Sequence, residues 1–516
     1  MDLISTVTFL PLFGAIVLMF FPREHEGASR VFSFLVTVVA FFLSLKLLYG
    51  FQTNADMQFV KDMPWIASLG ISYKVGVDGI SLFLVLLVTF TMPIAVLSSF
   101  RAITDRVKEF HVCMLLLETA MLGAFVSLDL FLFYVFWEMM LIPMYFLIGM
   151  WGGKRRIYET IKFFIFTMIG SLLMLVGILY VVFQFKAQTG TLTFDLFRLY
   201  DVQLSAQSQW LVFLAFALSF AIKVPMFPFH TWLPDAHVEA PTAASVILAG
   251  VLLKMGGYGF LRFAMPLFPE AALRGAPIIV ALALIGIIYG ALVAMVQKDV
   301  KKLVAYSSVS HLGFVMLGLF ALNSIGVTGA IYQMLNHGLS TGALFLLVGI
   351  IYERRHTRLI EDFGGLTRVM PWFAVYFMIV TLSSIGLPLT NGFVGEFLIL
   401  LGAFKANPMW GIVAAIGVVL GAIYMLWMYQ RVFFGEITHA ENENLKDLSG
   451  REIAVLAPII ALIFFMGIFP NPILRRMEPA VDKFIERVVE KRVARESQAG
   501  FEEFVVENDA GAGEVR

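Results

Sequence analysis

Long apolar runs make up most of this sequence, and they constrain the fold more than any other feature. Of the 516 residues, 59% are hydrophobic and only 14% are charged, whereas a soluble protein has about a quarter charged residues. A membrane-spanning helix needs about 20 mainly apolar residues. Runs of this kind lie at 3–21, 30–49, 78–100, 110–128, 130–150, 157–183, 208–229, 240–262, 276–296, 300–321, 325–351, 371–401, 411–433 and 453–470. The sequence therefore predicts an all-α polytopic membrane protein with about 14 transmembrane helices.

Basic residues in the loops predict the orientation of these helices. If the first residue faces outward, the inward loops hold eighteen basic residues and the outward loops hold seven. Because basic loops favour the inward side, both ends of the chain are expected outside. The run that begins at Leu3 follows no basic region and precedes no small-residue cleavage site, so we expect a retained span rather than a signal peptide.

Two segments outside the spans have patterns of their own. Alternation around Ile71–Val77 predicts a short β-hairpin in the outward loop 50–77. In the tail 471–516, apolar residues recur at helical spacing between charges, which predicts an amphipathic helix on the membrane surface or on a neighbouring protein. Residues 498–516 are acidic and contain glycine, and we expect them to be disordered.

Two spans contain helix-breaking residues in their apolar stretch. The span 208–229 ends with Pro225 and Pro228, and the span 371–401 contains the stretch Gly386–Gly392. Such breaks are tolerated at membrane depth where they line a cavity. The two breaks are five spans apart, and this spacing points to two inverted repeats with a site between them.

The predicted organisation follows from these breaks. It comprises N-terminal helices 1–3 with the hairpin in 1–109, a first inverted five-helix repeat in 110–262, a second in 276–433, a last span at 453–470, and an amphipathic and disordered tail at 471–516.

Four charged residues lie within the spans or at their breaks: Glu138, Lys223, Lys254 and Glu396. A charge at the bilayer centre costs about 3 kcal/mol on insertion scales, so such residues pair, titrate or line a wet path. Two of each sign on separate spans point to a route for protons or other cations. The alternatives are that Glu138 belongs to a structural ion pair and that Lys223 extends its amine to the membrane interface.

Other buried polar residues add to this route. His311 and His337 lie in adjacent spans among serine and threonine hydroxyls. Histidine titrates near neutral pH and suits a proton relay; the alternative is a pair of ordinary core histidines. Glu118 is a further acid in mid-span, and its role stays open.

After the first break the chain becomes polar, with His230, Asp235, His237 and Glu239 in a predicted inward loop. This loop would admit protons or would be an ordinary solvated loop.

Composition excludes several classes of site. The single cysteine, Cys113, allows neither an internal disulfide nor a cysteine-ligated iron–sulfur cluster in this sequence. Basic and acidic residues balance at 37 each, so there is no basic excess for binding nucleic acid.

The stretch from Lys223 to His237, Lys-Val-Pro-Met-Phe-Pro-Phe-His-Thr-Trp-Leu-Pro-Asp-Ala-His, resembles the signature of the antiporter-like subunits of respiratory complex I, the proton-translocating NADH:quinone oxidoreductase. The resemblance extends over the whole chain in length and span count. Trp137-Glu138 and the glutamate at position 396 are similar to the M (ND4-type) branch in particular. The L and N branches and the Mrp antiporter subunits usually have lysine at the matching break, and the L branch has a long lateral helix for which this tail is too short.

The resemblance implies a role for each matched residue. Glu138 and Lys223 would form the input pair, Lys254 and His311 would carry the proton along the middle of the membrane with His337 beside them, and Glu396 would release it outside.

The resemblance also implies the setting. The chain would be a multi-pass protein of a bacterial plasma membrane, or less readily of an organelle inner membrane, in contact with lipid, with L- and N-type subunits and with small membrane subunits. It would bind no cofactor, and NADH, FMN, iron–sulfur clusters and quinone would belong to other subunits. Three alternatives stay open: a cation/proton antiporter subunit of the Mrp type, a proton-pumping subunit of a membrane-bound hydrogenase, and a structural spacer with vestigial charges.

Overall fold

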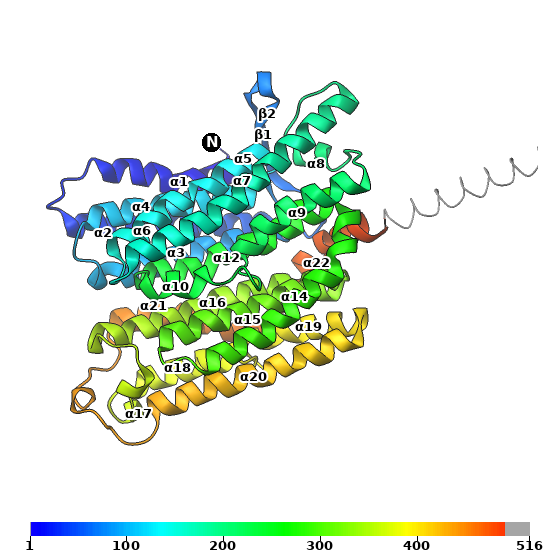
Figure 1. Cartoon of the computed structure of the whole chain (residues 1–516). Helices are drawn as coiled ribbons and strands as arrows, with labels where there is room; N and C mark the ends of the chain where they lie inside the picture. The colour runs from blue at the N-terminus through cyan, green and yellow to red at the C-terminus, as the bar shows by residue number, and fades with distance from the viewer. Residues whose placement is uncertain (1, 491–516) are drawn as a thin grey trace, which may run out of the picture.

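A computed structural model describes residues 2–490 of the chain, which form a bundle of long helices and one small hairpin (Figure 1). The elements of the N-terminal part are α1 (Leu3–Met19), α2 (Glu26–Gly50), β1 (Gln58–Ile66), a 3₁₀ turn η1 (Ala67–Leu69), β2 (Ile71–Val77), α3 (Ser81–Ala102), α4 (Val107–Val126), α5 (Leu130–Met139), α6 (Leu141–Trp151), α7 (Arg156–Thr189), α8 (Leu196–Leu199), α9 (Ala206–Lys223) and α10 (Trp232–Glu239).

The following elements are α11 (Thr242–Ile247), a π-helical turn η2 (Leu248–Leu252), α12 (Leu253–Gly259), a second π-helical turn η3 (Phe260–Ala264), α13 (Met265–Leu267), α14 (Pro269–Met295), α15 (Val300–Phe320) and α16 (Ser324–Arg355). The last are η4 (Ile360–Asp362), α17 (Leu366–Val369), α18 (Pro371–Ser384), α19 (Asn391–Ala406), α20 (Pro408–Phe433), η5 (Ala440–Asn442), α21 (Gly450–Ile468), α22 (Asn471–Ile485) and a π-helical turn η6 (Glu486–Glu490).

Every predicted apolar run coincides with a helix or with a broken pair of helices. In the part of the chain that the structure describes, twelve helices are long and apolar enough to cross a membrane. The count of 14 would also need α1 and the pair α18 and α19, which are shorter, and it stays a prediction. The all-α membrane fold itself is confirmed.

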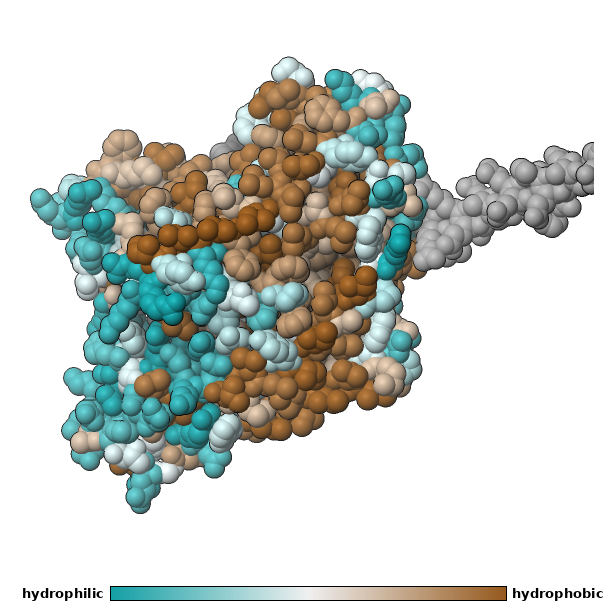
Figure 2. Space-filling model, viewed as in Figure 1, coloured by the Kyte–Doolittle hydropathy of each residue, from teal (hydrophilic) through white to brown (hydrophobic). Residues whose placement is uncertain are grey.

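Loops predicted on the same side lie at the same end of the bundle. The inward loops are 20–25, 103–106, 152–155, 296–299, 356–370 and 434–449. Hydrogen bonds link them: Trp151 Nε1 donates to the carbonyl oxygen of Asp105 (2.8 Å), and Arg354 Nε donates to that of Lys446 (2.7 Å). We call this the inward end and the opposite one, with the hairpin, the outward end. Between them hydrophobic residues cover most of the visible face (Figure 2).

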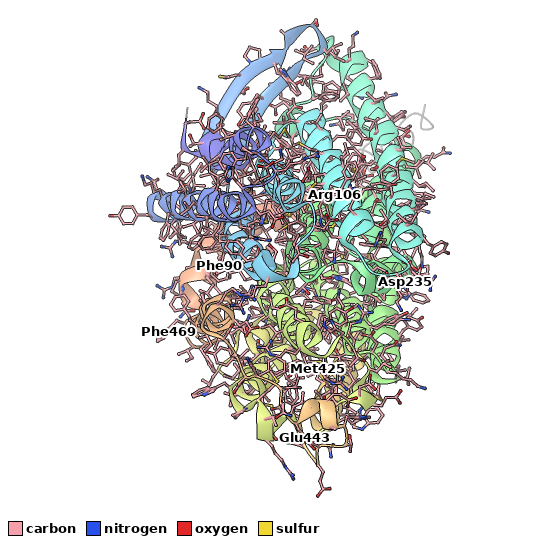
Figure 3. All side chains as sticks on the ribbon, turned by 90° about the vertical axis from the view of Figure 1, so that its left-hand side faces the viewer. Phe90, Arg106, Asp235, Met425, Glu443 and Phe469 are labelled. Atoms are coloured by element: carbon pink, nitrogen blue, oxygen red, sulfur yellow. The ribbon has the colours of Figure 1, made fainter. Side chains whose placement is uncertain are left out.

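Seen from the inward end, many of the helices are viewed nearly end-on (Figure 3). Arg106, Asp235 and Glu443 face the viewer there and belong to three separate segments, the α3–α4 loop, α10 and the α20–α21 loop. The polar ends of distant segments therefore share one surface.

The predicted β-hairpin is confirmed. Strands β1 and β2 pair antiparallel, and Gly70 between them has a φ of +66°, which glycine adopts without steric cost. An ion pair between Lys74 and Asp195 ties the hairpin to the segment before α8.

The predicted amphipathic helix is confirmed in α22, which packs on α16 of the same chain. Its buried face includes Ile473, Met477 and Phe484. The acidic segment 498–516, which was expected to be disordered, lies outside the described residues.

Both predicted helix breaks are confirmed. Helix α9 ends at Lys223, and residues 224–231 separate it from α10. Helix α18 ends at Ser384 and α19 begins at Asn391, with Gly386 at a φ of +73° between them. The inverted symmetry of the two halves stays a prediction.

Two local features differ from the sequence expectations. The expected polar inward loop is largely helix α10, because Pro234 lies in its first turn, where the missing N–H has no intrahelical partner anyway. His237 on that helix is fully buried and stacks on Phe345, with ring centroids 4.4 Å apart. The predicted span 130–150 is one candidate membrane span, Leu130–Trp151, but its helix is interrupted at Met140 between α5 and α6, since Pro143 cannot donate the helical hydrogen bond four residues back.

Candidate functional site: a buried polar chain across the bundle

Lys254 lies at the beginning of α12, directly after the π-helical turn η2. Its side chain is fully buried. Nζ donates a hydrogen bond to the carbonyl oxygen of Ala249, which belongs to that turn, and it lies 2.6 Å from Nδ1 of His337 on α16. π-helical turns often mark functional positions, because they offer backbone groups that a regular helix would use internally. The turn thus supplies one of the two partners of the lysine.

Two histidines connect this lysine with Glu396. The rings of His337 and His311 have centroids 6.0 Å apart. Nδ1 of His311 lies 3.1 Å from Oε1 of Glu396, and both side chains are largely buried. Four of the six predicted site residues therefore form one continuous chain of contacts: Lys254, His337, His311 and Glu396.

Amide side chains brace Glu396 at the break between α18 and α19. Gln333 Nε2 donates to Oε1 of Glu396 at 3.0 Å. Asn336 Nδ2 donates to Oε1 of Gln333 (3.0 Å) and to the carbonyl oxygen of Asn391 (2.8 Å). Ser383 at the end of α18 donates to Oδ1 of Asn391 (2.6 Å). These bonds link α16 to both ends of the break and hold the carboxylate beside His311.

Sequence reasoning missed Gln333 and Asn336. The sequence contained a signal for both amides, because they are polar residues close to His337 in a mainly apolar run: Gln333 lies four residues before it and Asn336 one residue before it. A spacing of four residues also places Gln333 on the same face of α16 as His337.

Glu138 and Lys223 are close neighbours without a direct ion pair between them in residues 2–490. Lys223, the last residue of α9, is buried, and its amine lies 5.4 Å from the ring centroid of Trp137 and 5.9 Å from that of Phe163. A cation over an aromatic face is stabilised by the ring quadrupole. Glu138 interacts with Tyr134, with Ser171 and, through charge alone, with Lys223. The pair expected from the sequence is therefore coupled by charge but separated in space.

Glycine allows close helix packing directly after Lys254. A Cβ on Gly256 would lie 2.7 Å from the carbonyl oxygen of Phe220, so only glycine lets α12 approach the end of α9 this closely. This contact brings the two lysine-bearing helices together at the first break.

Glu118 stays outside this chain of contacts. It is fully buried in α4, and neither carboxyl oxygen has a hydrogen-bond partner among the described residues. No group of His, Cys, Asp or Glu in residues 2–490 is arranged to hold a metal ion. The amine, imidazole and carboxyl groups of Lys254, His337, His311 and Glu396 are each able to hold and release a proton.

Comparison with known proteins agrees with this interpretation. Residues 127–424 match the family described as NADH:quinone oxidoreductase/Mrp antiporter, transmembrane. NADH-quinone oxidoreductase subunit M of Rhodobacter capsulatus is 48% identical over 498 residues, which cover 94% of this chain and 96% of the relative. NADH-ubiquinone oxidoreductase chain 4 of Marchantia polymorpha is 43% identical, over 94% of this chain and 97% of the relative.

A solved structure supports the same assignment. A chain of respiratory complex I from Thermus thermophilus with bound NADH superposes with a TM-score of 0.86 at 34% identity, covering 94% of this chain and 99% of that chain. Family match, relatives and fold agree over nearly the whole length, and the chain belongs to the antiporter-like membrane subunits of NADH:quinone oxidoreductase, in their subunit M (ND4-type) branch.

Proposed function

We propose that this multi-pass inner-membrane protein moves protons through the chain Lys254–His337–His311–Glu396, with Glu138 and Lys223 controlling entry. The observation that carries the proposal is the unbroken sequence of contacts from Lys254 to Glu396, buried in the middle of an apolar bundle. Buried ionisable groups in membrane proteins mark ion pathways.

Each contact gives a donor and an acceptor for one transfer. A proton passes from Nζ of Lys254 to Nδ1 of His337, since a neutral imidazole nitrogen accepts a hydrogen bond from an ammonium group. His337 releases a proton from Nε2, which has no hydrogen-bond partner within residues 2–490, and Nε2 of the neighbouring His311 ring takes it up. His311 then donates from Nδ1 to Oε1 of Glu396, 3.1 Å away. Each histidine takes a proton on one ring nitrogen and gives one up from the other, so it returns to its neutral form.

The separation of Glu138 from Lys223 makes the entry adjustable. At an effective dielectric constant of about 20, two unit charges attract by about 4 kcal/mol at 4 Å and by about 2 kcal/mol at 8 Å. A change in their spacing on this scale alters the stability of the protonated lysine by about 2 kcal/mol, roughly thirty-fold in its affinity for a proton. A conformational change in a neighbouring subunit would thereby load or empty Lys223.

The redox reaction belongs elsewhere in the complex. The relatives are named as NADH-quinone or NADH-ubiquinone oxidoreductases, and the solved neighbour has NADH bound to the complex. We infer that NADH, FMN, iron–sulfur clusters and quinone are held by other subunits, and that this chain contacts the L- and N-type subunits and small membrane subunits of the membrane arm.

A Glu138→Gln substitution in the chromosome tests the proposal in membrane vesicles. The amide keeps the shape of the side chain and removes the charge that acts on Lys223. NADH-driven proton uptake and quinone-linked turnover are expected to collapse, while assembly and NADH oxidation by an artificial acceptor persist. Glu443→Gln, at an exposed glutamate of the inward end, is the matched control and should have no effect.

Other outcomes would reject the proposal. Unchanged proton uptake in Glu138→Gln vesicles would make the buried charges structural. NADH oxidation that never depends on this chain would instead favour a transporter without redox coupling.

A further inference from the structure

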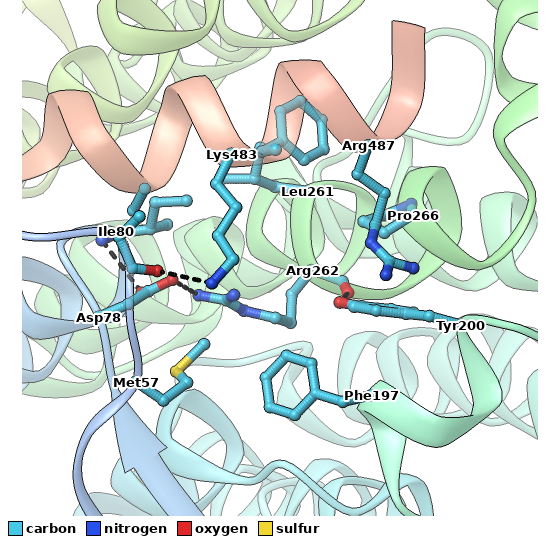
Figure 4. A pocket seen from close by; sticks show the side chains of 13 residues that line it. Met57, Asp78, Ile80, Phe197, Tyr200, Leu261, Arg262, Pro266, Lys483 and Arg487 are labelled. Carbon is cyan, nitrogen blue, oxygen red and sulfur yellow. Dashed lines mark hydrogen bonds and ion pairs between the residues drawn. The ribbon is translucent and has the colours of Figure 1, made fainter. Parts of the chain in front are cut away.

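A cavity at the outward end lies outside the polar chain described above. It has a volume of about 280 Å³, and it is lined by the segment before β1, by Phe197 and Tyr200, by η3 and by α22 (Figure 4). Sites for small molecules have volumes of about 300–1,000 Å³. This cavity lies at the lower end of that range, a size that one or two side chains of a peptide fill.

The wall of the cavity is positively charged. Arg262 is buried and forms an ion pair with Asp78, which neutralises both charges. Lys483 and Arg487 of the C-terminal helical segment also line the cavity. Because Asp78 is the one acid among the described residues of the lining, these two cations leave it with a surplus of positive charge.

The ion pairs of Lys483 and Arg487 are exposed. Lys483 lies 3.1 Å from Asp56, whose side chain is 77% exposed, and Arg487 lies 3.8 Å from Asp201, whose side chain is 65% exposed. Exposed ion pairs of this kind contribute little to stability, because water and salt screen the attraction between the two charges. Either cation can therefore exchange its carboxylate partner at small cost, while the guanidinium group of Arg487 keeps its place over the ring of Tyr200, 4.3 Å from the centroid.

The rest of the lining is mainly apolar. Met57, Phe197, Leu261 and Pro266 line the cavity (Figure 4), and Phe484 is a further apolar residue of the lining. The complementary ligand has an aromatic or aliphatic side chain with carboxylates next to it.

The sequence contains such a segment shortly beyond the described residues. Residues 501–509 read Phe-Glu-Glu-Phe-Val-Val-Glu-Asn-Asp, with four acids, no base, and two phenylalanines. We propose that the segment 501–509 docks in this cavity, with the ring of Phe504 or Phe501 among the apolar side chains and Glu502 and Glu503 on Lys483 and Arg487.

The length of the chain permits this contact. The described chain ends at Glu490, three residues after Arg487, and fourteen further residues lead to Phe504. Fourteen residues reach at most about 50 Å when fully extended. Tethering at this distance corresponds to an effective concentration on the order of millimolar, so even weak contacts suffice for docking.

Disulfide trapping in the assembled complex tests the docking. With Cys113 replaced by Ala, Met57→Cys is combined with Phe504→Cys, and vesicles are oxidised mildly. Trypsin then releases peptides 47–61 and 496–516, and mass spectrometry measures how much of them is joined. The matched control, Met57→Cys with Gly513→Cys, uses the same two peptides but places the second cysteine outside the acidic and aromatic segment.

We expect the Phe504 pair to form several-fold more cross-link than the Gly513 pair. Arg487→Glu should lower this yield about two- to five-fold, as for loss of one screened ion pair, and Glu503→Arg in the same chain, for which trypsin releases 504–516 in place of 496–516, should restore it. Equal yields for the two cysteine pairs would overturn the proposal. A peptide of another subunit joined to the cysteine introduced at position 57, in place of 496–516, would overturn it too. So would a yield unaffected by charge reversal, as expected if a phospholipid fills the cavity.

Discussion

Replacing Lys254 by arginine separates two roles that the structure allows for this residue: supplying a fixed positive charge and releasing a proton. The guanidinium group has five N–H donors and can still bond the carbonyl oxygen of Ala249 and Nδ1 of His337, which are the partners of the lysine amine. It remains charged at all accessible pH values. Lys254→Arg therefore preserves the charge and the hydrogen bonds and removes only proton release.

The expected loss follows from the reference acidities of the two groups. The pKa of free arginine exceeds that of free lysine by at least about 2 units, and each unit is worth about 1.4 kcal/mol. Transfer to the same imidazole nitrogen then costs about 3 kcal/mol more, which slows the step about a hundred-fold or more. Proton uptake and quinone-linked NADH oxidation should fall together by this factor in vesicles whose complex is assembled normally.

Two further variants complete the test. Lys46→Arg, at an exposed position on α2, should leave both activities unchanged. Lys254→Met should lose both activities, because it removes charge and proton together. If Lys254→Arg retains full proton uptake, the lysine acts only as a fixed charge and the relay proposed above is wrong.

Three other substitutions have defined outcomes. Glu396→Lys puts an ammonium group beside the donor Nδ1 of His311, and proton uptake should be lost even where quantitative gels show normal assembly. Glu118→Leu should raise the thermal midpoint of the purified complex and leave proton uptake intact, because the buried carboxyl has no hydrogen-bond partner among the described residues and its burial costs about 1–3 kcal/mol. A lower midpoint would reveal a hydrogen-bond partner of Glu118. Asp78→Asn leaves the buried Arg262 charge uncompensated and should destabilise the outward end by about 3–5 kcal/mol, seen as faster amide exchange around it. Burial alone would raise the pKa of the Asp78 carboxyl, but Arg262 and the backbone donors lower this pKa below its usual range. The Asp78–Arg262 pair therefore stabilises the protein above about pH 4, and this stabilisation disappears as pH falls through the lowered pKa. Amide exchange at the outward end that does not change with acidification would contradict this pH dependence.

Much of the fold could be predicted because single-helix properties decide it. Apolar length determines which segments span the membrane, and proline and glycine determine where two of them break. The same reasoning identified the ionisable residues, since a charge within an apolar run is costly wherever it lies.

The contacts of those residues could not be predicted in the same way. Lys254 and His337 are 83 residues apart in the sequence, and only the packing of α11 and η2, directly before α12, against α16 brings their nitrogens together. The lack of a direct ion pair between Glu138 and Lys223 in residues 2–490 has the same cause, because the position of Trp137 beside the lysine amine depends on three-dimensional packing. The sequence shows which ionisable residues lie within apolar spans, and the tertiary structure determines which of them contact one another.

The two π-helical turns that flank α12 make chain length a determinant of function. Each residue in an α-helix advances by about 100° around the axis, and η2 and η3 each accommodate a wider turn on either side of Lys254. Deleting a single residue such as Gly250 would convert η2 to a regular helical turn and leave Lys254 in nearly the same orientation. The carbonyl oxygen of Ala249 would then accept a helical N–H, and the amine would lose one of its two partners although every side chain of the polar chain is kept. Single-residue deletions in η2 should thus impair proton transfer without changing any of the proposed site residues.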